Sequence, residues 1–205
     1  KEIALGYYNL VGLLNLKAIA LDTSDNAISK LVNINTTINE DKKTKDKTIA
    51  LLDTGYLGID LLVIDRGIAS FSRIISHGSK DLSLNVANAS NLTAMDAEDT
   101  VFNSQVIEDI TDKFIQEIVI NKLNEWLEDI GRVFHYYTSR ESGNKIDVIY
   151  IHGGISDYNV FNKKLSTELN LPVERIVNLS SIRIAKNMEC DISKYLNAIG
   201  CIIRR

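Results

Sequence analysis

The chain has 205 residues, of which 45% are hydrophobic, and its 27 acidic and 23 basic side chains give a net charge of −4. A chain of this length can bury one good core or two small ones. Its acidic balance gives no sign of a nucleic-acid-binding surface. No apolar run reaches the ~18 to 20 residues needed to cross a bilayer, and the start lacks a signal-peptide pattern. Because the chain starts at Lys1, partway into an amphipathic stretch, we expect it to be a fragment.

The opening part of the chain combines two helical patterns, an apolar run and a polar tail. Residues 3–14 have mixed helical spacing, which predicts the end of a helix. Residues 16–21 (LKAIAL) predict a buried strand, and residues 22–25 predict the cap of a helix over 26–32. Residues 35–47 are polar, with four lysines within six positions, and predict a solvated loop. A specific acidic partner for these lysines is the alternative.

Three apolar stretches follow at short spacing. Residues 49–52 are apolar throughout, as expected of a strand buried on both faces. Residues 58–64 predict a second strand, Asp65-Arg66-Gly67 a tight turn, and residues 68–75 a third strand. Residues 48–75 therefore predict an antiparallel meander of three neighbouring strands.

A polar segment and a long helix come next. Residues 78–100 are polar, low in aromatic side chains and weakly periodic, so we expect an irregular, partly mobile excursion that extends to residue 103. Apolar residues then recur with a 3.6-residue period over 104–139, which predicts the strongest helix in the chain. Ser104 is its candidate N-cap, and Ser142-Gly143-Asn144 ends it.

Side chains of this helical stretch fall into two groups. Asp109 and Asp112 are expected on its polar side, as part of a solvated face. Trp126 and the cluster Phe134-His135-Tyr136-Tyr137 are expected in the core rather than around a ligand.

The last part of the chain alternates strands and helices. Residues 146–151 predict a buried parallel strand, 156–170 a helix, 173–177 a short strand and 192–205 a final helix. From residue 48 onward the predicted order is three strands, helix, strand, helix, strand and helix.

Cysteine and histidine residues give no sign of a metal site. Cys190 and Cys201 lack CxxC spacing, so we expect two ordinary buried thiols. His77, His135 and His152 are widely separated and lack metal-ligand spacing, so surface or packing roles are expected. The sequence also lacks a nucleophile elbow and a Walker-type phosphate loop.

Two glycine turns follow apolar strands that are far apart in the chain, Asp53-Thr54-Gly55 and His152-Gly153-Gly154. Glycine lets backbone N–H groups approach phosphate oxygens, and a carboxylate such as Asp53 can hold Mg²⁺ through water. Gly153 and Gly154, with Ser156 at the start of a helix, place a strand end and a helix N-terminus together, which suits a nucleotide. Ordinary turns that favour glycine are the alternative at both places.

The element order and the two turns resemble the ribonuclease-H-like half-domain from which actin, heat-shock chaperone ATPases and sugar kinases are built. Within this superfamily, the sequence resembles the family of the type IV pilus assembly protein PilM. The likeness covers about residues 48–205 and, more weakly, 8–32. Four segments carry it: LLDTGYLGIDLLVIDRGIASFSRIISHGSKDL, LNEWLEDIGRVFHYYTSR, IDVIYIHGGISDYNVFNKKLSTELNLPVERI and DISKYLNAIGCIIRR.

The resemblance implies an α/β fold, namely a ribonuclease-H-like, actin-like ATPase lobe with a mixed five-stranded sheet and helices on both faces (βββαβαβα). It implies that residues 1–47 are the remnant of a first lobe with its connection. Residues 48–205 would form the second lobe, with the excursion at 78–103. In such proteins an Asp-x-Gly turn faces the phosphates of a nucleotide, and a Gly-Gly turn lies against its adenosine.

The resemblance also implies the residues of a nucleotide site. Asp53 would hold Mg²⁺ through water. Whether ATP and Mg²⁺ bind to the complete protein stays open, and they are not expected to bind to the fragment alone. No catalytic residue is assigned, because the resemblance implies a nucleotide-binding scaffold with at most weak ATPase activity. The implied cofactor-binding residues are Asp53, Thr54, Gly55, Gly153, Gly154 and Ser156.

The implied function is that of a cytoplasmic scaffold, peripheral at the inner membrane, in the type IV pilus assembly platform that serves twitching motility. Its implied partners are the N-terminal cytoplasmic tail of a PilN-like membrane protein, the platform itself and the motor ATPases of the pilus.

Two alternatives stay open. The first is an active ATPase or kinase of the same superfamily, although no carboxylate can be assigned as the base that a kinase needs. The second is a filament-forming cell-division protein like FtsA. Such a protein would add a C-terminal amphipathic membrane helix, which the chain does not show before Arg205.

Overall fold

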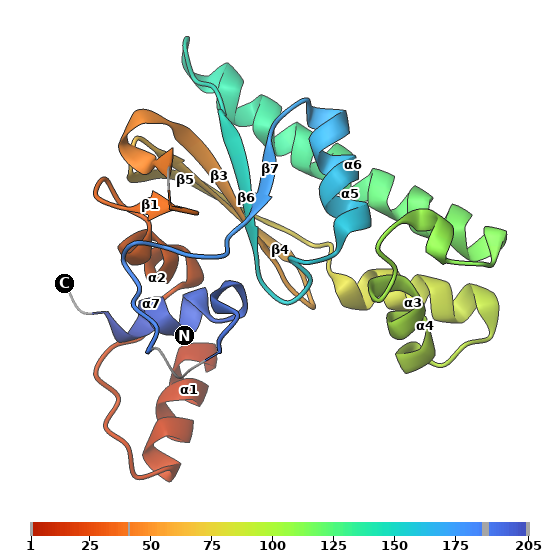
Figure 1. Ribbon diagram of the computed structural model, residues 1–205. Coiled ribbons are helices and arrows are strands. Elements are labelled where there is room, and N and C mark those ends of the chain that lie inside the picture. The colour runs from red at the N-terminus through yellow and green to blue at the C-terminus, as the bar shows by residue number, and fades with distance from the viewer. Residues whose placement is uncertain (1, 41, 186–188, 204–205) are drawn as a thin grey trace.

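The computed structural model describes residues 2–40, 42–185 and 189–203. A five-stranded sheet with helices on both faces forms its centre (Figure 1). The helices are α1 (Glu2–Leu13), α2 (Ser24–Leu31), α3 (Ser79–Ser90), α4 (Ala94–Phe102), α5 (Lys113–Arg140), α6 (Asn159–Leu169) and α7 (Leu196–Ile202). The strands are β1 (Thr37–Ile38), β2 (Lys42–Lys43), β3 (Thr48–Thr54), β4 (Ile59–Asp65), β5 (Ile68–Ile75), β6 (Val148–His152) and β7 (Val173–Arg175). Three short 3-10 helices are η1 (Thr44–Asp46), η2 (Ile107–Asp109) and η3 (Ile192–Lys194).

The five-stranded sheet has the order β5-β4-β3-β6-β7. β3, β4 and β5 form an antiparallel meander. A tight turn joins β4 to β5 at Arg66 and Gly67, both of which have positive φ. β6 pairs parallel with β3, and β7 pairs parallel with β6. The predicted meander over 48–75 and the predicted parallel strand beside it are therefore confirmed.

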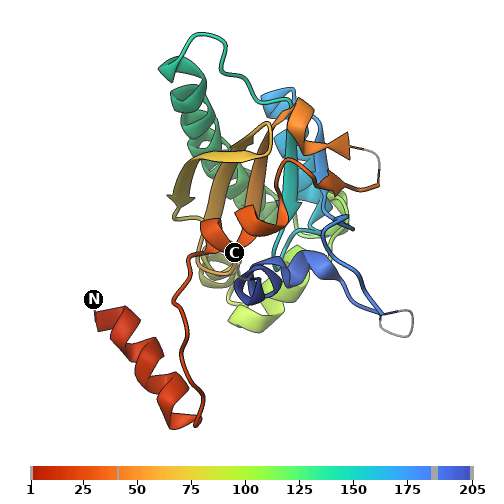
Figure 2. The same cartoon turned by 90° about the vertical axis from the view of Figure 1, so that its left-hand side faces the viewer.

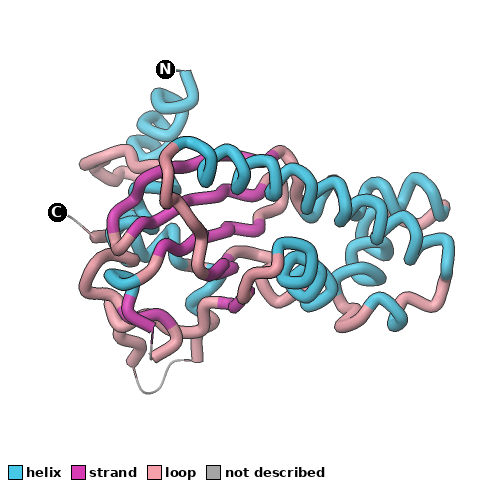
Figure 3. The backbone as a smooth tube through the Cα atoms, turned by 90° about the horizontal axis from the view of Figure 1, so that it is seen from above, coloured by secondary structure: helices cyan, strands magenta, loops and turns pink. Residues whose placement is uncertain are grey.

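Each face of the sheet buries its own apolar core. Alternation along β3 places Ile49 and Leu51 in one core and Ala50 and Leu52 in the other. Helices α2 and α7 cover the first face, while α5 and α6 cover the second, with α3 and α4 at one end (Figure 1). Seen from above, α5 runs along the sheet and continues past it toward α3 and α4 (Figure 3). Burial on both faces explains why the central strands β3, β4 and β6 are almost continuous apolar runs in the sequence.

Helix α5 supplies most of the core on its side of the sheet. Trp126 is fully buried and meets Phe161 of α6 edge-on, with 5.6 Å between the ring centroids. Phe134 and Tyr137 are also buried, which confirms the predicted core role of these aromatic residues. For His135 and Tyr136 the predicted core role is wrong, because both side chains are exposed, Tyr136 to 56%.

The predicted strand over residues 16–21 is wrong. These residues are extended, but no strand of the described chain lies beside them, so their backbone groups have no ladder to join. Helix α1, which precedes them, buries no residue. It stands away from the rest of the molecule at the end of the extended segment (Figure 2).

The predicted solvated loop over 35–47 is more ordered than expected. It contains the two-residue strands β1 and β2 and the turn η1. Thr36 and Thr44 are buried within it, and the Thr44 N–H donates to the Thr36 carbonyl at 3.1 Å. Polar composition predicted exposure here, but these threonine hydroxyls find backbone partners instead.

The predicted irregular excursion over 78–103 is also wrong, because it forms α3 and α4. Leu82 and Val86 lie four residues apart on α3, and Ala97 and Val101 do so on α4; all four are fully buried. The Thr93 hydroxyl caps α4 by accepting a hydrogen bond from the Asp96 N–H at 3.1 Å. The residues around these pairs are mostly small or polar, so the sequence shows only a weak helical periodicity of apolar residues.

The long helix begins at Lys113 rather than at Ser104. The Asp112 carboxylate caps it by accepting from the Phe114 N–H at 2.8 Å. Asp109 accepts from the N–H groups of Gln105 and Val106 at 2.8 and 3.0 Å, and so closes the η2 turn. Both aspartates are exposed, as expected, but they lie before α5, where they cap or close local structures, and not on the polar side of the long helix.

The end of the chain differs from the prediction in three ways. The predicted helix over 192–205 is divided into η3 and α7, and residues 204–205 lie outside the described residues. The helix predicted from 156 begins at Asn159. Cys190 and Cys201 are exposed rather than buried. Cys201 lies on α7 beside Gly200, but only the Leu196 and Gly200 side of that helix is buried.

Candidate functional site

The two glycine turns meet at one end of the sheet. β3 and β6 are parallel neighbours, and their register places Asp53 directly beside His152. The carboxyl ends of parallel strands lie at the same edge of a sheet, so Thr54-Gly55 and Gly153-Gly154 leave the sheet together. Topology thus brings together two motifs that are far apart in the sequence.

Gly153 makes this close approach possible. Its φ is +99°, and a Cβ atom there would lie 2.8 Å from both the N and O atoms of Thr54 and against the Asp53 carboxylate. Thr54 ties the turns together further, since its hydroxyl donates to the His152 carbonyl at 3.0 Å. The Ile155 N–H donates to the Thr54 carbonyl at 3.3 Å. The Thr54 side chain is fully buried, so in this structure it braces the turn.

The Asp53 carboxylate lies at the surface of this junction, with 20% of its side chain exposed. One oxygen accepts a hydrogen bond from the Asn197 amide of α7 at 2.5 Å. The other lies 3.8 Å from Nδ1 of His152. Burial lowers the pKa of His152, although the Asp53 charge acts in the opposite direction, so the imidazole is neutral at pH 7.

A second carboxylate faces Asp53 across the hairpin. Asp60 of β4 is the register partner of Asp53. Burial raises the pKa of Asp60, and the charges of Asp53 and Asp25 raise it further. These three aspartates and Asn197 line one small cavity. Within the described part of the chain, no group of three histidine, cysteine or acidic side chains is placed to hold a metal ion.

The Gly55 turn is closed by its own hydrogen bonds. The Gly55 N–H donates to the Gly58 carbonyl at 3.0 Å. The first N–H groups of α3 then donate to the turn, from Ser79 to Gly55 O at 3.2 Å and from Lys80 to Tyr56 O at 3.1 Å. The N-terminus of α3 therefore supports the turn from behind.

Ser156 belongs to a polar cluster beneath the second turn. It is fully buried, accepts from Nε of Arg175 at 3.1 Å and lies 3.2 Å from the Ser193 hydroxyl. Arg175 also forms an ion pair with Asp191. Burial acts to raise the pKa of Asp191, but Ser193 and Arg175 outweigh it, and the pKa of that carboxyl is lowered. The cluster ties the loop after β6 to β7 and to the segment before α7.

A polar pocket of about 680 Å³ lies beside this cluster. Its volume is within the range of small-molecule sites, roughly 300–1,000 Å³. The end of α4, the loop after Gly154, α6 and β7 enclose it, and Lys163 and Arg175 supply positive charge. Its lining residues are Phe102, Asn103, Gln105, Ser156, Asp157, Asn159, Asn162, Lys163, Ser166, Val173 and Arg175.

The structure brings the predicted residues together, but several of their polar groups already have hydrogen-bond partners within the protein. Asp53, Gly153 and Gly154 meet at the junction of the turns, and Gly154 is exposed. The Thr54 and Ser156 hydroxyls and the Gly55 N–H have partners within the protein. Sequence reasoning missed Asn197, Asp60 and Arg175. Only Asp60 had a signal, since a hairpin turn between two strands places it opposite Asp53.

Comparison with solved structures identifies the class of the fold. The structure of the PilM-PilN type IV pilus biogenesis complex superposes with a TM-score of 0.71 and 18% identity, covering 93% of this chain and 56% of that one. The ethanolamine utilization protein EutJ from Carboxydothermus hydrogenoformans gives 0.62 and 17%, with coverage of 93% and 56%. MreB 5 of Spiroplasma citri bound to AMPPNP gives 0.67 and 12%, with coverage of 97% and 62%. The fold is that of an actin-like ATPase lobe.

The sequence places the chain more closely. Residues 8–205 match the family described as type IV pilus assembly protein PilM, and the chain belongs to that family. No curated protein sequence matches the chain. The chain spans little more than half the length of the first two structures that it resembles. Among the described residues, no helix has both the length and the apolar character of a membrane span.

Proposed function

We propose that the chain is the second lobe of a PilM-type scaffold that binds the N-terminal cytoplasmic tail of a PilN-like inner-membrane protein. Two observations support this proposal: the family match over residues 8–205, and the similarity to a PilM protein in complex with PilN. The scaffold would lie at the cytoplasmic side of the inner membrane. It would link the pilus assembly platform to its motor ATPases and so serve twitching motility.

The division into lobes rests on the exposed N-terminal part. Residues 1–47 would be the remnant of the first lobe and its connection, and residues 48–205 the second lobe. Ten large apolar side chains of residues 2–21 are each more than half exposed, as expected where another lobe would pack. They are Ile3, Leu5, Tyr7, Tyr8, Leu10, Leu13, Leu14, Leu16, Ile19 and Leu21.

We further propose that the two-lobed protein binds Mg·ATP at the junction of the glycine turns. The observation that carries this is the contact of Gly153 with Asp53 and Thr54, where any side chain at Gly153 would close the approach. Asp53 would hold Mg²⁺ through water, because a hard cation with several retained waters needs few protein carboxylates. The absence of a three-ligand cluster among the described residues is compatible with that arrangement.

The other predicted residues would either contact the nucleotide through their backbone or hold the two glycine turns in place. Gly153 and Gly154 would lie against the adenosine, next to the polar pocket of about 680 Å³. Thr54 and Ser156 would hold the two turns in place through their buried hydrogen bonds. Gly55 would shape the phosphate turn. Bound between the lobes, the nucleotide would supply negative charge and a bridging cation, and so act as a clamp.

Titration calorimetry tests the nucleotide site. In the two-lobed protein, Asp53→Ala should weaken Mg·ATP binding about tenfold or more, because one charge-assisted contact is worth ~1.5 to 3 kcal/mol. Asp46→Ala is the matched control, since this exposed carboxylate lies just before the opposite end of β3. The 205-residue chain alone should bind poorly, because the other half of the proposed clamp would lie in the first lobe. Micromolar binding by the chain alone, or unchanged affinity of the Asp53 variant, would refute the assignment.

The PilN proposal has its own test. A labelled synthetic peptide with the sequence of the PilN-like tail should bind the two-lobed protein in a fluorescence anisotropy titration. Under this proposal the peptide groove would lie largely in the first lobe, so the 205-residue chain should bind this peptide far more weakly. Absence of binding to the two-lobed protein would remove the proposed partner.

A further inference from the structure

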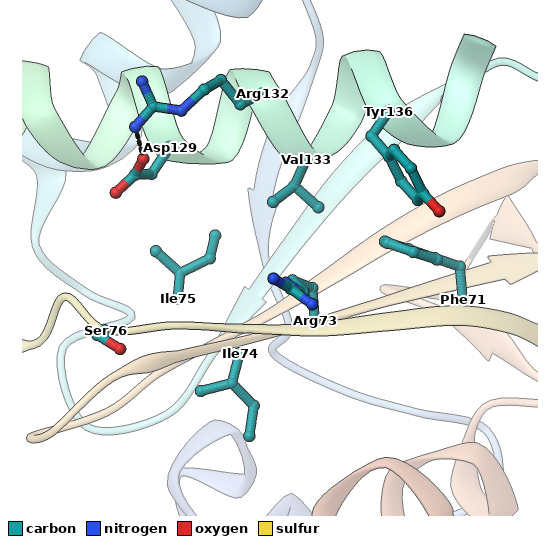
Figure 4. A pocket seen from close by; sticks show the side chains of 9 residues that line it. All are labelled: Phe71, Arg73, Ile74, Ile75, Ser76, Asp129, Arg132, Val133 and Tyr136. Carbon is teal, nitrogen blue, oxygen red and sulfur yellow. Dashed lines mark hydrogen bonds and ion pairs between the residues drawn. The ribbon is translucent and has the colours of Figure 1, made fainter. Parts of the chain in front are cut away.

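The edge strand β5 and helix α5 enclose a groove that the proposed function does not use. β5 is the last strand of the sheet, and no strand of the described chain pairs with its outer side. Its outer backbone N–H and C=O groups are therefore available to another strand. The groove has a volume of about 630 Å³ (Figure 4). Its lining residues are Phe71, Arg73, Ile74, Ile75, Ser76, Asp129, Arg132, Val133 and Tyr136.

The floor of the groove is apolar and aromatic. Phe71 and Ile75 point from β5 toward α5, and Val133 and Tyr136 point from α5 toward β5, whereas Ile74 points to the other face (Figure 4). The ring centroids of Phe71 and Tyr136 are 5.7 Å apart. Side chains of alternate residues on an added strand would face this floor.

The charges around the groove are mainly positive. The side chain of Arg73 is exposed and has no hydrogen-bond or ion-pair partner among the described residues. Arg132 is paired with Asp129, whose other oxygen accepts from His77 at 2.7 Å, so this carboxylate is already shared. The Arg140 guanidinium lies 5.9 Å from the ring centroid of Tyr136. Two arginines thus line the groove and a third lies near the ring of Tyr136, in a chain whose net charge is −4.

We propose that this groove binds an extended, acidic segment of a partner protein, which adds to β5 as a sixth strand. Backbone pairing with β5 would provide affinity, and alternate side chains would provide specificity, as in other cases of strand addition. The groove-facing residues of the segment would be aliphatic over Phe71 and Val133 and acidic near Arg73 and Arg132. Charge complementarity favours this occupant over a second copy of the chain, which would set arginines against arginines.

A charge-swap titration tests the proposal. The probe is a labelled peptide, Ser-Val-Thr-Glu-Ser-Val-Thr-Glu-Ser, in which valine and glutamate alternate on one face of an extended chain. It should bind with submillimolar affinity, and Arg73→Glu should weaken binding about tenfold, as expected for the loss of a charge-assisted contact. The same peptide with lysine in place of glutamate should bind the parent protein less tightly than the glutamate peptide does. It should bind the Arg73→Glu, Arg132→Glu double variant more tightly than the glutamate peptide does.

Arg183→Glu is the matched control, because Arg183 is exposed in the segment after β7, the opposite edge strand of the sheet. It should leave binding unchanged, and amide shifts in NMR spectra should concentrate on residues 68–75. The proposal is overturned by failure of the glutamate peptide to bind, by equal binding of the lysine peptide, or by an equal effect of Arg183→Glu. An Arg73-dependent dimer in light scattering would assign the groove to a second copy instead.

Discussion

Gly153 has a backbone conformation that other residues rarely adopt, and it also has no room for a side chain. Gly153→Ala should therefore lower the free energy of unfolding by about 3 kcal/mol or more, from strain at positive φ together with the clash against Thr54. Gly154→Ala is the matched control. Its Cβ would meet only the Thr54 carbonyl, at 3.9 Å, so its cost should stay within about 1 kcal/mol. Urea unfolding measures both, and equal effects would contradict the close contact between the two turns.

Asp60 should make the protein less stable as the pH rises. Burial and the charges of Asp53 and Asp25 raise its pKa above the ordinary value of 3.8, so the folded state favours the protonated form. Its contribution is therefore fully present below pH 3.8 and is lost as the pH rises through its folded pKa. Asp60→Asn should raise the melting temperature at pH 7, and the difference should vanish below pH 3.8. A lower melting temperature of the variant at pH 7 would show that the ionised group has a stabilising partner.

At the residue scale, the sequence predicts the positions of the strand-end motifs better than the hydrogen-bond partners of their side chains. Aspartate and glycine after apolar runs were sufficient to place Asp53 and Gly153 at the ends of two strands. The hydrogen bond between Arg175 and Ser156 could not be predicted, because it joins strand β7 to the loop after β6. The Asn197 bond to Asp53 is similar, since it depends on how α7 crosses the end of the sheet.

Helix α5 is the element whose packing the sequence predicts best, and its two sides differ sharply. Trp126 is fully buried against α6, so Trp126→Ala should cost on the order of 3 to 5 kcal/mol. Phe114→Ala on the same helix should cost less than about 1 kcal/mol, because that ring is 56% exposed. Urea melts of the two variants provide the comparison. A Trp126 variant that unfolded like the parent would show that α5 does not pack on the sheet as described.

Helices and strands with a clear apolar pattern in their own sequence were predictable. Segments whose structure depends on packing against another element were not. The central strands follow from continuous apolar runs, because both faces of the sheet are covered. Residues 16–21 have the same apolar character, yet they form no strand because none of the described strands lies beside them. α3 and α4 were missed for the opposite reason. Each buries only a few small or medium side chains, so tertiary packing rather than a broad apolar stripe holds them.

At the scale of the whole molecule, the sheet and its covering helices form two cores, while the N-terminal part lies outside both. None of the residues of α1 is buried, and none of the residues 2–21 belongs to either core. Ten exposed large apolar side chains thus lie in this one segment, from which a first lobe would continue under the proposed function. Removal of this segment should therefore reduce self-association of the chain without changing the stability of the sheet.

A chain that begins at Asp22 should keep the free energy of unfolding of the parent within about 1 kcal/mol, because the deleted residues contribute nothing to the cores. Asp22 is retained because it forms an ion pair with Lys30 at 2.6 Å. The truncated chain should also self-associate less in sedimentation experiments, since a large exposed apolar surface is lost. Deletion through Leu31 is the control, because it removes the buried residues Ala27, Ile28 and Leu31 of α2 and should abolish cooperative unfolding. If the shorter deletion were as damaging as the longer one, residues 2–21 would pack on the sheet, and the surface assigned to a first lobe would not exist.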